Sequence, residues 1–340
     1  MSIFRDKLIV AGPCGAESRQ QILKVARELS VGGVRYFRAG LWKPRTLPNT
    51  FEGVGEQGLQ WLCEARKETS MKIGTEVAKA EHIRLAKEAG LDFLWIGART
   101  TTNPFAVQEI ADNLKKEGFY PMVMVKNPVI ADIKLWIGAI ERLRKAGVKN
   151  IVAVHRGFFM DDSVYRNPPL WHIPIEMKRL LPEIDIVCDP SHISGKRELV
   201  EGIMQKALRL GFDGFMVETH PDPPKALSDS EQQLTPTDFL SILHKFRSQS
   251  TEQSGEVLEE YRSRIDTLDR LLIETIAKRM QISKEIGEWK KQHNMQIFQP
   301  KRYADILQRT VEYGRDRDIS PEFIKSLMEL IHQESVEKQW

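Results

Sequence analysis

Short apolar runs alternate with amphipathic segments along residues 1–247 of the chain. Eight of these runs are continuous rather than alternating, at 7–12, 34–40, 71–77, 93–98, 122–127, 150–157, 185–192 and 214–220. Continuous apolar strands are typical of parallel sheets that are covered on both faces. The segments between them, such as 81–90 and 133–147, have helical periodicity and end in Gly. The pattern predicts an α/β protein with a (β/α)8 TIM barrel, and a doubly wound open sheet is the alternative.

The pattern changes after residue 247. Residues 248–255 are a stretch of Ser, Gln and Gly typical of a flexible linker, and only two of the 22 Gly and two of the 17 Pro follow them. Residues 256–292 read as one long helix, with a stripe of apolar residues at 258, 261, 265, 268, 272, 276, 280, 282 and 286. Pro300 and Ser320-Pro321 begin two more helices. We expect a barrel at 1–247 and a small three-helix all-α domain at 256–340.

Composition narrows the class of protein. The 50 basic and 47 acidic residues give a net charge of +3, which is too balanced for a nucleic-acid-binding protein. No apolar stretch approaches the ~18 residues needed to cross a membrane. Three Cys are an odd and sparse set, which favours a reducing compartment over a disulfide framework. A cytoplasmic protein is expected.

Polar residues follow every predicted strand, and in a barrel these strand ends meet at the rim that carries the active site. Six of them are cations suited to phosphate and carboxylate groups: Arg38, Lys43, Arg45, Arg99, Lys126 and Arg156. Six cations fit two phosphorylated substrates, or a phosphate plus a carboxylate, better than one phosphate. Cys14, His192, Glu218 and a nearby acid could bind a divalent metal ion, and their chemistry favours Mn, Fe, Co or Zn. An inert buried thiol is the alternative for Cys14.

Nine motifs occur in one order over residues 11 to 235: GPC, KPRT, GTEV, IGART, VKNP, HRG, DPSH, VETH and ALSD. The series resembles the metal-dependent 3-deoxy-D-arabino-heptulosonate-7-phosphate (DAHP) synthases, which are (β/α)8 barrels that condense phosphoenolpyruvate with erythrose 4-phosphate. The intact KPRT sequence resembles this branch more than the related 3-deoxy-octulosonate-8-phosphate synthases. The resemblance implies one divalent metal ion, with ligands at Cys14, His192, Glu218 and Asp229.

The same resemblance implies the roles of the rim residues. Phosphoenolpyruvate would be held by Arg99, Lys126 and Arg156, with Arg38 and Lys43 close by. Arg45 and Thr46 would bind the phosphate of erythrose 4-phosphate, and Glu76 would position the attacking water. Lys43, Lys126 and Glu76 are the residues expected to be catalytic in the barrel.

A cation in the apolar stripe marks the helical domain. Arg279 lies seven residues from both Leu272 and Ile286, where a charge needs an anionic partner. Lys290 shares its face, at about 20° around the helix, whereas Arg262 is about 100° away and could serve a pocket in a partner chain. Ser335 and Gln339 share a face of the third helix. A plain coiled-coil dimerisation tail is the alternative interpretation.

The segment from Tyr261 to Gln339 resembles the small all-helical chorismate mutases, which rearrange chorismate to prephenate. The ligand-contacting positions of that family fall on Arg262, Arg279, Lys290, Gln299, Arg302, Ser335 and Gln339. Lys290 and Gln339 would be catalytic at the ether oxygen, and Arg262 would come from the partner of an intertwined dimer. Gln299 stands where some members have an acid, and Tyr303 where Glu is frequent. Both positions touch the hydroxyl end of the ligand.

Three hypotheses for the whole chain follow. It is a bifunctional enzyme, a DAHP synthase with a ligand-binding allosteric sensor, or a DAHP synthase with a dimerisation module. Prephenate is expected to inhibit the barrel, because the first predicted strand begins close to Met1 and the chain shows no other regulatory module. The expected partners are small molecules and further copies of the chain, in a homodimer through the helical domain or a higher oligomer, without nucleic acid or membrane.

Overall fold

The computed structural model describes residues 6–43, 50–160, 164–248, 255–296 and 299–339. The chain forms two compact units, Met1–Thr251 and Glu252–Trp340, and each is considered by itself. Among the described residues, no helix combines the length and the apolar character that crossing a bilayer requires.

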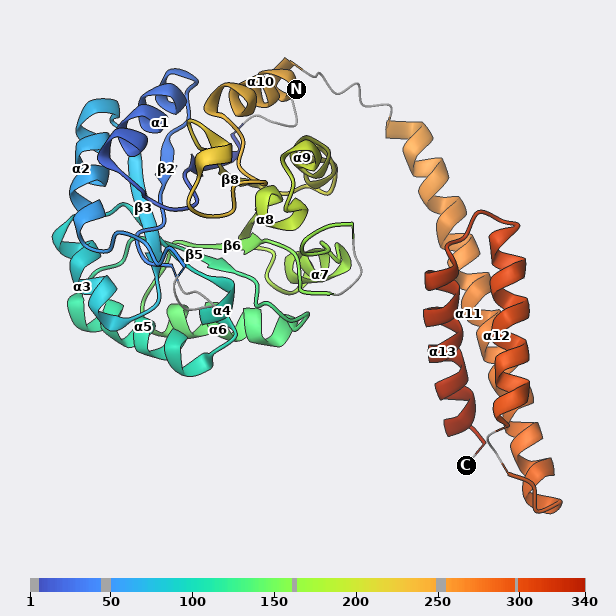
Figure 1. The fold of residues 1–340 in the computed structure, drawn as a ribbon. Coiled ribbons are helices and arrows are strands. Elements are labelled where there is room, and N and C mark those ends of the chain that lie inside the picture. Colours follow the sequence, from blue (N-terminus) through green and yellow to red (C-terminus); the bar gives the residue numbers. More distant parts are fainter. Residues whose placement is uncertain (1–5, 44–49, 161–163, 249–254, 297–298, 340) are drawn as a thin grey trace. The chain divides into compact units, whose positions relative to one another are not determined.

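The first unit contains eight parallel strands that close into a barrel in chain order (Figure 1). They are β1 (Leu8–Gly12), β2 (Tyr36–Arg38), β3 (Lys72–Val77), β4 (Phe93–Ile96), β5 (Met122–Lys126), β6 (Ile151–His155), β7 (Asp185–Cys188) and β8 (Gly214–Glu218). Closure is completed by β1 and β8, which pair from Leu8 opposite Gly214 to Gly12 opposite Glu218. The predicted TIM barrel is confirmed, and the open-sheet alternative is wrong.

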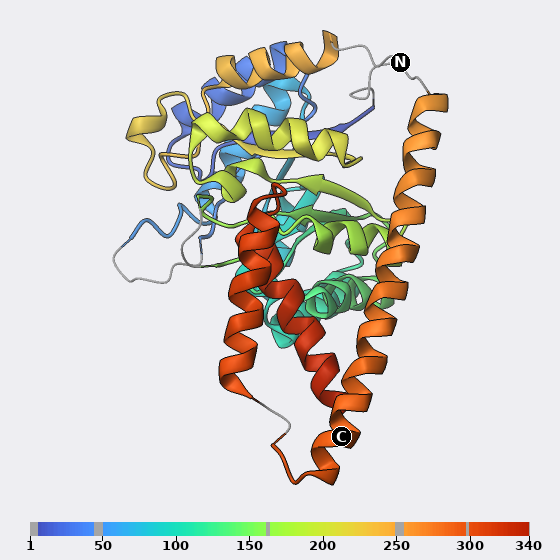
Figure 2. The ribbon, with the colours of Figure 1, turned by 90° about the vertical axis from the view of Figure 1, so that its right-hand side faces the viewer.

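Helices surround the strands (Figures 1 and 2). They are α1 (Arg19–Val31), α2 (Gln57–Thr69), α3 (Ala80–Glu88), α4 (Ala98–Thr101), α5 (Pro104–Glu117), α6 (Ile133–Lys145), α7 (His172–Leu180), α8 (Pro190–Ser194), α9 (Val200–Arg209) and α10 (Pro236–Ser248), with 3-10 turns η1 (Arg197–Leu199) and η2 (Pro223–Lys225). Asn103 and Asp132 show why α5 and α6 begin where they do, because each side chain accepts hydrogen bonds from backbone N–H groups of the first turn.

Alternating side chains divide the barrel into two apolar cores. One core lies inside the strands and includes Phe93, Trp95 and Met124. The other lies between strands and helices, and includes Val123 and Val125, which flank Met124. Successive residues of a strand point to opposite faces, so the inward side chains of each strand are two residues apart. This alternation decides which side chain at each strand end faces the barrel interior.

The second unit consists of α11 (Gly255–Gln292), α12 (Pro300–Arg315) and α13 (Pro321–Glu337), which confirms the predicted all-helical module. Ser320 caps α13 through a hydrogen bond from the Phe323 N–H, with Pro321 in the first turn. A side chain at Gly287 of α11 would place its Cβ 2.7 Å from Cα of Gln339, so glycine permits the close approach of α11 to the C-terminal end of the chain. The first turns of α11 extend beyond α12 and α13 in both views (Figures 1 and 2).

Candidate active sites of the two domains

The charged side chains of the barrel occupy the last inward position of their strands. Tyr36, Met124 and Met216 belong to the inner core, and Arg38, Lys126 and Glu218 follow them by two residues. Asp189 likewise follows Val187, another residue of the inner core, by two residues. The lower part of the barrel interior is therefore apolar, and its C-terminal end is ionic.

Cys14, Glu218 and Asp229 form an acidic cluster at this end, with one ligand atom from each within 4.8 Å of the others. The Cys14 thiol donates a hydrogen bond to Oδ2 of Asp229 at 3.0 Å. Asp229 has a φ of 51°, a left-handed conformation that Asp tolerates better than most residues. Backbone strain of this kind concentrates at functional sites.

His192 borders the acidic cluster. Its Nε2 lies 3.8 Å from Oε1 of Glu218, and its Nδ1 lies 2.8 Å from Oδ2 of Asp189. A carboxylate behind one imidazole nitrogen commonly orients the other nitrogen toward a metal ion. The structure therefore brings three of the four expected metal ligands within 4.8 Å of one another, and it places the fourth, His192, beside Glu218 with Asp189 behind it.

Burial and charge act together on the pKa values of this cluster. Burial raises the pKa of the Cys14 thiol, and Glu218 raises it further. Burial alone would raise the pKa of Asp229, but His192, Arg166 and Lys43 offset it and hold the pKa below its usual range. The carboxylates are thus ionised beside a protonated thiol, and a divalent cation would favour the thiolate. The donor set fits a borderline transition metal such as Mn, Fe, Co or Zn.

Two buried ion pairs support the floor of the site. Arg38 Nη2 donates to Glu218 Oε1 at 3.1 Å, and its guanidinium lies 4.7 Å from the ring centre of Trp95. Lys126 Nζ donates to Asp189 Oδ2 at 2.8 Å. The Arg38 and Glu218 side chains are 2% and 0% exposed, so removal of one partner would leave an uncompensated buried charge.

A cavity of about 330 Å³ opens beside these pairs. Five of the residues that line it were expected at the site: Glu76, Arg99, Lys126, Arg156 and His192. Oε2 of Glu76 accepts a hydrogen bond from Trp95 Nε1 at 3.0 Å. Gly97 leaves room for this carboxylate, because a Cβ there would lie 2.2 Å from Oε1 of Glu76. The cavity is suited to a small, multiply charged anion.

The remaining predicted rim residues lie in other places. Arg38 is buried against Glu218 and is not among the residues that line the cavity. Lys43 Nζ contacts Cys14, at 2.6 Å from Sγ and 2.9 Å from the carbonyl oxygen. Arg45 and Thr46 lie outside the described residues.

Two histidines at the strand ends do not join the rim site. His155 follows inward-facing Val154, so it points outward, where it packs against Trp136, Phe158, Trp171 and Phe212. Burial lowers its pKa to about 3, which leaves the ring neutral. His220 Nε2 lies 3.2 Å from Oε2 of Glu17. The expectation that every strand end contributes to one rim site is corrected for these two side chains.

Sequence reasoning missed Arg166 and Asn167, which also line the cavity. Arg166 Nη1 donates to Oδ1 of Asp229 at 2.8 Å, and Oδ1 of Asn167 accepts from Arg156 Nη1 at 2.8 Å. Both residues lie in the long segment between β6 and α7, away from any strand end. The signal that could have found them is the Arg-Asn pair in the loop after the HRG motif.

The helical unit has its own cationic site. Arg279 of α11 donates to the Ser335 hydroxyl of α13, and Lys290 Nζ donates to Oε1 of Gln339 at 3.3 Å. Lys290 is 9% exposed and Ser335 is 4% exposed. Within the described part of the chain, no carboxylate lies within ion-pair distance of Arg279, and burial lowers its pKa. Four of the seven predicted positions thus come together at a site suited to an anion.

The other three predicted positions are exposed. Arg262 pairs with Glu259 on its own helix at 3.2 Å, and Gln299 and Arg302 lie near the start of α12. The single chain does not bring Arg262 to Arg279.

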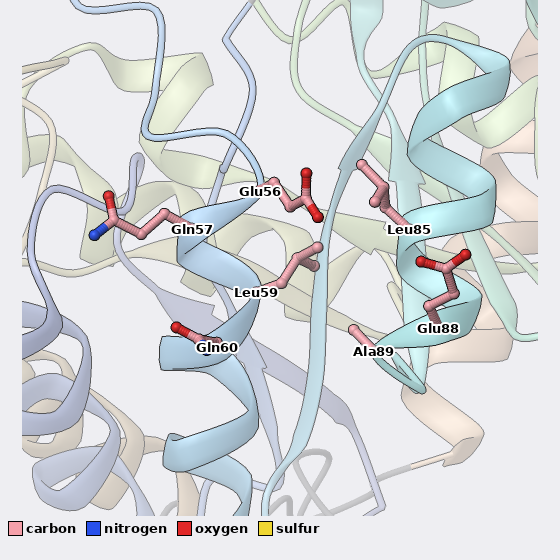
Figure 3. A pocket seen from close by; sticks show the side chains of 7 residues that line it. All are labelled: Glu56, Gln57, Leu59, Gln60, Leu85, Glu88 and Ala89. Carbon is pink, nitrogen blue, oxygen red and sulfur yellow. The ribbon is translucent and has the colours of Figure 1, made fainter.

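A separate hollow of about 500 Å³ lies on the outside of the barrel between α2 and α3 (Figure 3). Seven residues line it: Glu56, Gln57, Leu59, Gln60, Leu85, Glu88 and Ala89. The lining carries two carboxylates and no Lys or Arg, so it does not suit a phosphorylated ligand.

Fold and site together define a TIM-barrel protein with a cationic cavity beside a candidate metal centre, joined to an all-helical domain with a cationic site of its own. Residues 5–254 match the DAHP synthetase I family, and residues 261–340 match chorismate mutase type II. The chain belongs to the DAHP synthetase I family and carries a C-terminal chorismate mutase domain. The two domains make it a bifunctional enzyme of aromatic biosynthesis, with a 3-deoxy-7-phosphoheptulonate synthase (transferase) and a chorismate mutase (isomerase) domain.

The known proteins to which this chain is similar match its barrel domain. A phospho-2-dehydro-3-deoxyheptonate aldolase of Thermotoga maritima is 35% identical over 241 residues, which are 70% of this chain and 68% of the relative. A 2-dehydro-3-deoxyphosphooctonate aldolase of Wolinella succinogenes is 26% identical over 264 residues, covering 70% of this chain and 97% of the relative. A crystal structure of the Thermotoga maritima DAHP synthase has a TM-score of 0.63 at 30% identity, covering 71% of this chain and 68% of that one.

Proposed function

We propose that the barrel condenses phosphoenolpyruvate with erythrose 4-phosphate to DAHP and phosphate, and that the helical domain rearranges chorismate to prephenate. The observation that carries the first activity is the cationic cavity directly beside the acidic cluster, with His192 contributing to both. The observation that carries the second is the Arg279–Ser335 and Lys290–Gln339 arrangement, which presents two cations to one site. Assays of phosphate release and of chorismate loss on the full-length chain test the two activities separately.

The barrel residues have different roles in the condensation. Arg99, Lys126 and Arg156 bind the phosphate and carboxylate of phosphoenolpyruvate, and Arg166 adds a fourth cation. Arg45 and Thr46 are proposed to bind the phosphate of erythrose 4-phosphate, with Lys43 between the two substrates. These cations offset repulsion between the substrates, so C3 of phosphoenolpyruvate can reach the aldehyde carbon. Glu76 positions the water that adds to C2 before phosphate leaves.

Cys14, His192, Glu218 and Asp229 are proposed to hold one divalent metal ion, Mn, Fe, Co or Zn. When bound, this ion supplies Lewis-acid polarisation of the aldehyde oxygen. Lys43 stabilises the thiolate of Cys14 from 2.6 Å, and Asp189 orients His192. A metal-dependent reaction is a proposal that rests on the chemistry of this donor set.

The mutase reaction needs no nucleophile and no general acid. Fixed cations and donors stabilise the compact, charge-separated transition state, and the rate follows from this differential binding. Arg279 and Arg302 bind carboxylates of chorismate, and Lys290 and Gln339 address the ether oxygen. Ser335 holds the guanidinium of Arg279 in place. Arg262 completes the site from a partner chain.

A homodimer through α11 is the proposed source of Arg262. The first turns of α11 carry an apolar stripe in which Ile265, Leu268 and Leu272 are 57%, 63% and 50% exposed. We expect Leu268→Glu to convert the dimer into monomers and to lower mutase activity at least about tenfold, because a charge in an apolar interface is costly. Light scattering and chorismate loss measure the two effects. Ser263→Glu, on the same helix but away from this stripe, is the control, and a dimer that survives Leu268→Glu would contradict the proposed interface.

Prephenate is proposed to inhibit the barrel from the helical domain. The chain joins two non-consecutive steps of one pathway. The concentration of the product of the second domain can therefore regulate the activity of the first domain. We expect millimolar prephenate to lower DAHP formation severalfold in the full-length chain, and Arg279→Ala to abolish this inhibition. Unchanged DAHP formation with saturating prephenate would contradict the proposal. A cytoplasmic location stays a prediction.

A further inference from the structure

Asn167 joins two parts of the barrel site through the two ends of its side-chain amide. Its Oδ1 accepts a hydrogen bond from Arg156 Nη1 at 2.8 Å, and its Nδ2 donates to the backbone carbonyl oxygen of His192 at 2.7 Å. Asn167 is 5% exposed and lies in the wall of the cavity. Each end of the buried amide therefore has a partner, and neither end is spent on water.

The backbone fixes the position of this amide. The N–H of Asn167 donates to the carbonyl oxygen of Ile193 at 3.1 Å, and the N–H of Arg166 donates to that of Ser194 at 3.3 Å. Gly157 has a φ of 77°, and a Cβ there would lie 2.0 Å from the carbonyl oxygen of Asn167. Glycine thus permits the close approach of the two segments, and the amide is held against both α8 and the end of β6.

The two partners of the side chain require an amide at position 167. A guanidinium offers only donors, and a backbone carbonyl offers only acceptor lone pairs. The amide of Asn satisfies both, with its oxygen toward Arg156 and its nitrogen toward the carbonyl of His192. Aspartate would satisfy the guanidinium but would place a carboxylate oxygen against the carbonyl oxygen, and alanine would satisfy neither partner.

Two of the other cations that line the cavity are paired with carboxylates. Lys126 Nζ lies 2.8 Å from Oδ2 of Asp189, and Arg166 Nη1 lies 2.8 Å from Oδ1 of Asp229. An anion that enters the cavity competes with these carboxylates for the two cations. Each of the two pairs therefore attracts the anion less strongly than an isolated positive charge would.

The guanidinium of Arg156 has uncharged partners instead. It donates to Oδ1 of Asn167 and, at 3.4 Å, to the carbonyl oxygen of Gly157. In the ranges that the structure describes, no carboxylate lies within ion-pair distance of it. Burial lowers the pKa of Arg156 to about 10, so the group remains protonated at neutral pH. Its positive charge is thus fixed in place by hydrogen bonds that do not neutralise it.

We propose that Asn167 is a positioning residue of the anion site: it holds the guanidinium of Arg156 in the cavity wall with an uncharged oxygen, and so keeps the charge of Arg156 available to a phosphate or carboxylate group of the ligand. The inference rests on the proposed condensation, in which Arg156 binds phosphoenolpyruvate, and adds a residue that sets the affinity for this substrate. An acid at position 167 would keep the hydrogen bond to Arg156 but would neutralise the cation.

The experiment compares Asn167→Ala and Asn167→Asp with the wild type in the full-length chain. We expect Asn167→Ala to raise the KM for phosphoenolpyruvate severalfold, because the guanidinium loses its fixed acceptor. Asn167→Asp should raise this KM further, to at least about tenfold above the wild type, because the new carboxylate competes with the ligand for Arg156. The kcat and the KM for erythrose 4-phosphate should change little in both variants. Calorimetric titrations with phosphoenolpyruvate alone and with inorganic phosphate alone measure the affinities without turnover.

Asn113→Asp is the matched control. Asn113 is an Asn of α5 that does not line the cavity, and its Nδ2 also donates to a backbone carbonyl oxygen, that of Glu109, at 2.8 Å. The same chemical change at this position should leave both KM values and both affinities as in the wild type. Circular dichroism of each variant shows that the chain is folded.

A purely structural role for Asn167 predicts equal effects of Ala and Asp on both substrates, and that result would overturn the inference. An increase in KM confined to erythrose 4-phosphate, larger for Asp than for Ala, would support the inference and overturn the proposed position of phosphoenolpyruvate. If Asn167→Asp does not fold, Asn167→Ala replaces it: an increase confined to one substrate supports the inference, and unchanged values overturn it.

The titrations separate this inference from the proposed condensation. If the wild-type chain forms no DAHP, the proposed activity of the barrel fails. A phosphate affinity that falls from the wild type to Asn167→Ala and further to Asn167→Asp would still support the role of Asn167. A phosphate affinity that is the same in all three chains would overturn it.

Discussion

Replacing Cys14 by Ser is expected to lower DAHP formation by about 10³-fold or more and to leave chorismate loss unchanged. Cys14, Glu218 and Asp229 offer ligand atoms within 4.8 Å of one another, and the softest of these donors is the thiolate. Loss of Lewis-acid assistance worth several kcal/mol corresponds to a rate loss of about this size. The measurements are phosphate release with both substrates and the metal content of the purified variant.

Cys63→Ser is the matched control, because Cys63 is a partly buried thiol of α2 outside the acidic cluster. The Cys63→Ser variant should keep its metal ion and its rate of DAHP formation. Treatment of the wild-type chain with a chelator should reproduce the effect of Cys14→Ser, and readdition of Mn or Co should restore DAHP formation. Full activity after complete metal removal would contradict the proposed centre.

Replacing Arg279 by Ala is expected to lower kcat/KM for chorismate by about 10²–10³-fold, with DAHP formation in the absence of prephenate unchanged. The guanidinium is held by Ser335 and has no carboxylate partner within the described residues, so its charge is available to the ligand. Removal of one preorganised donor from a transition-state site has an effect of this magnitude. Chorismate loss is followed by its ultraviolet absorbance.

Arg270→Ala is the control for this substitution. Arg270 lies on the same helix nine residues earlier, where its Nη2 donates to the Thr267 hydroxyl at 3.3 Å. Nine residues correspond to about two and a half turns of the helix, so Arg270 and Arg279 point to opposite faces. Equal mutase activities in the two variants would favour the interpretation of the helical domain as a dimerisation module.

The barrel could be predicted from sequence because its signal is local. Each strand is a short apolar run, and the helices between the runs repeat with a period that neighbouring residues reveal. The direction of each strand side chain could not be predicted, because strands that are buried on both faces are apolar throughout. His155 and Arg156 are adjacent and polar, but only Arg156 follows the inward parity of Val154. From the sequence pattern alone, both residues are predicted to lie at the rim.

The metal-ligand set depended on the resemblance as well as on the residue types. Cys14 and Asp229 are distant in the chain, and they meet because β1 closes the barrel against β8. Arg166 and Asn167 escaped prediction for a different reason. They belong to a long loop, and the fold of a loop follows from tertiary contacts such as the Arg166–Asp229 ion pair rather than from periodicity.

In the helical domain, spacing predicted the shared face of Ser335 and Gln339, because helical geometry is regular. It also placed Arg279 and Lys290 on one side of α11, and the structure brings all four together. The contact between Tyr303 and His332 could not be predicted in this way. It joins α12 and α13, whose relative rotation is set by packing, including the close approach at Gly314, where a Cβ would lie 2.8 Å from Cγ1 of Ile324.

On the proposed function, one chain carries two chemically independent active sites. The most direct measurement assays one preparation of the full-length protein for both activities, alongside Cys14→Ser and Arg279→Ala. We expect the wild type to perform both reactions, Cys14→Ser to retain only chorismate loss, and Arg279→Ala to retain only DAHP formation. A wild-type chain without chorismate turnover, or a single substitution that removes both activities from a folded protein, would contradict the proposed function.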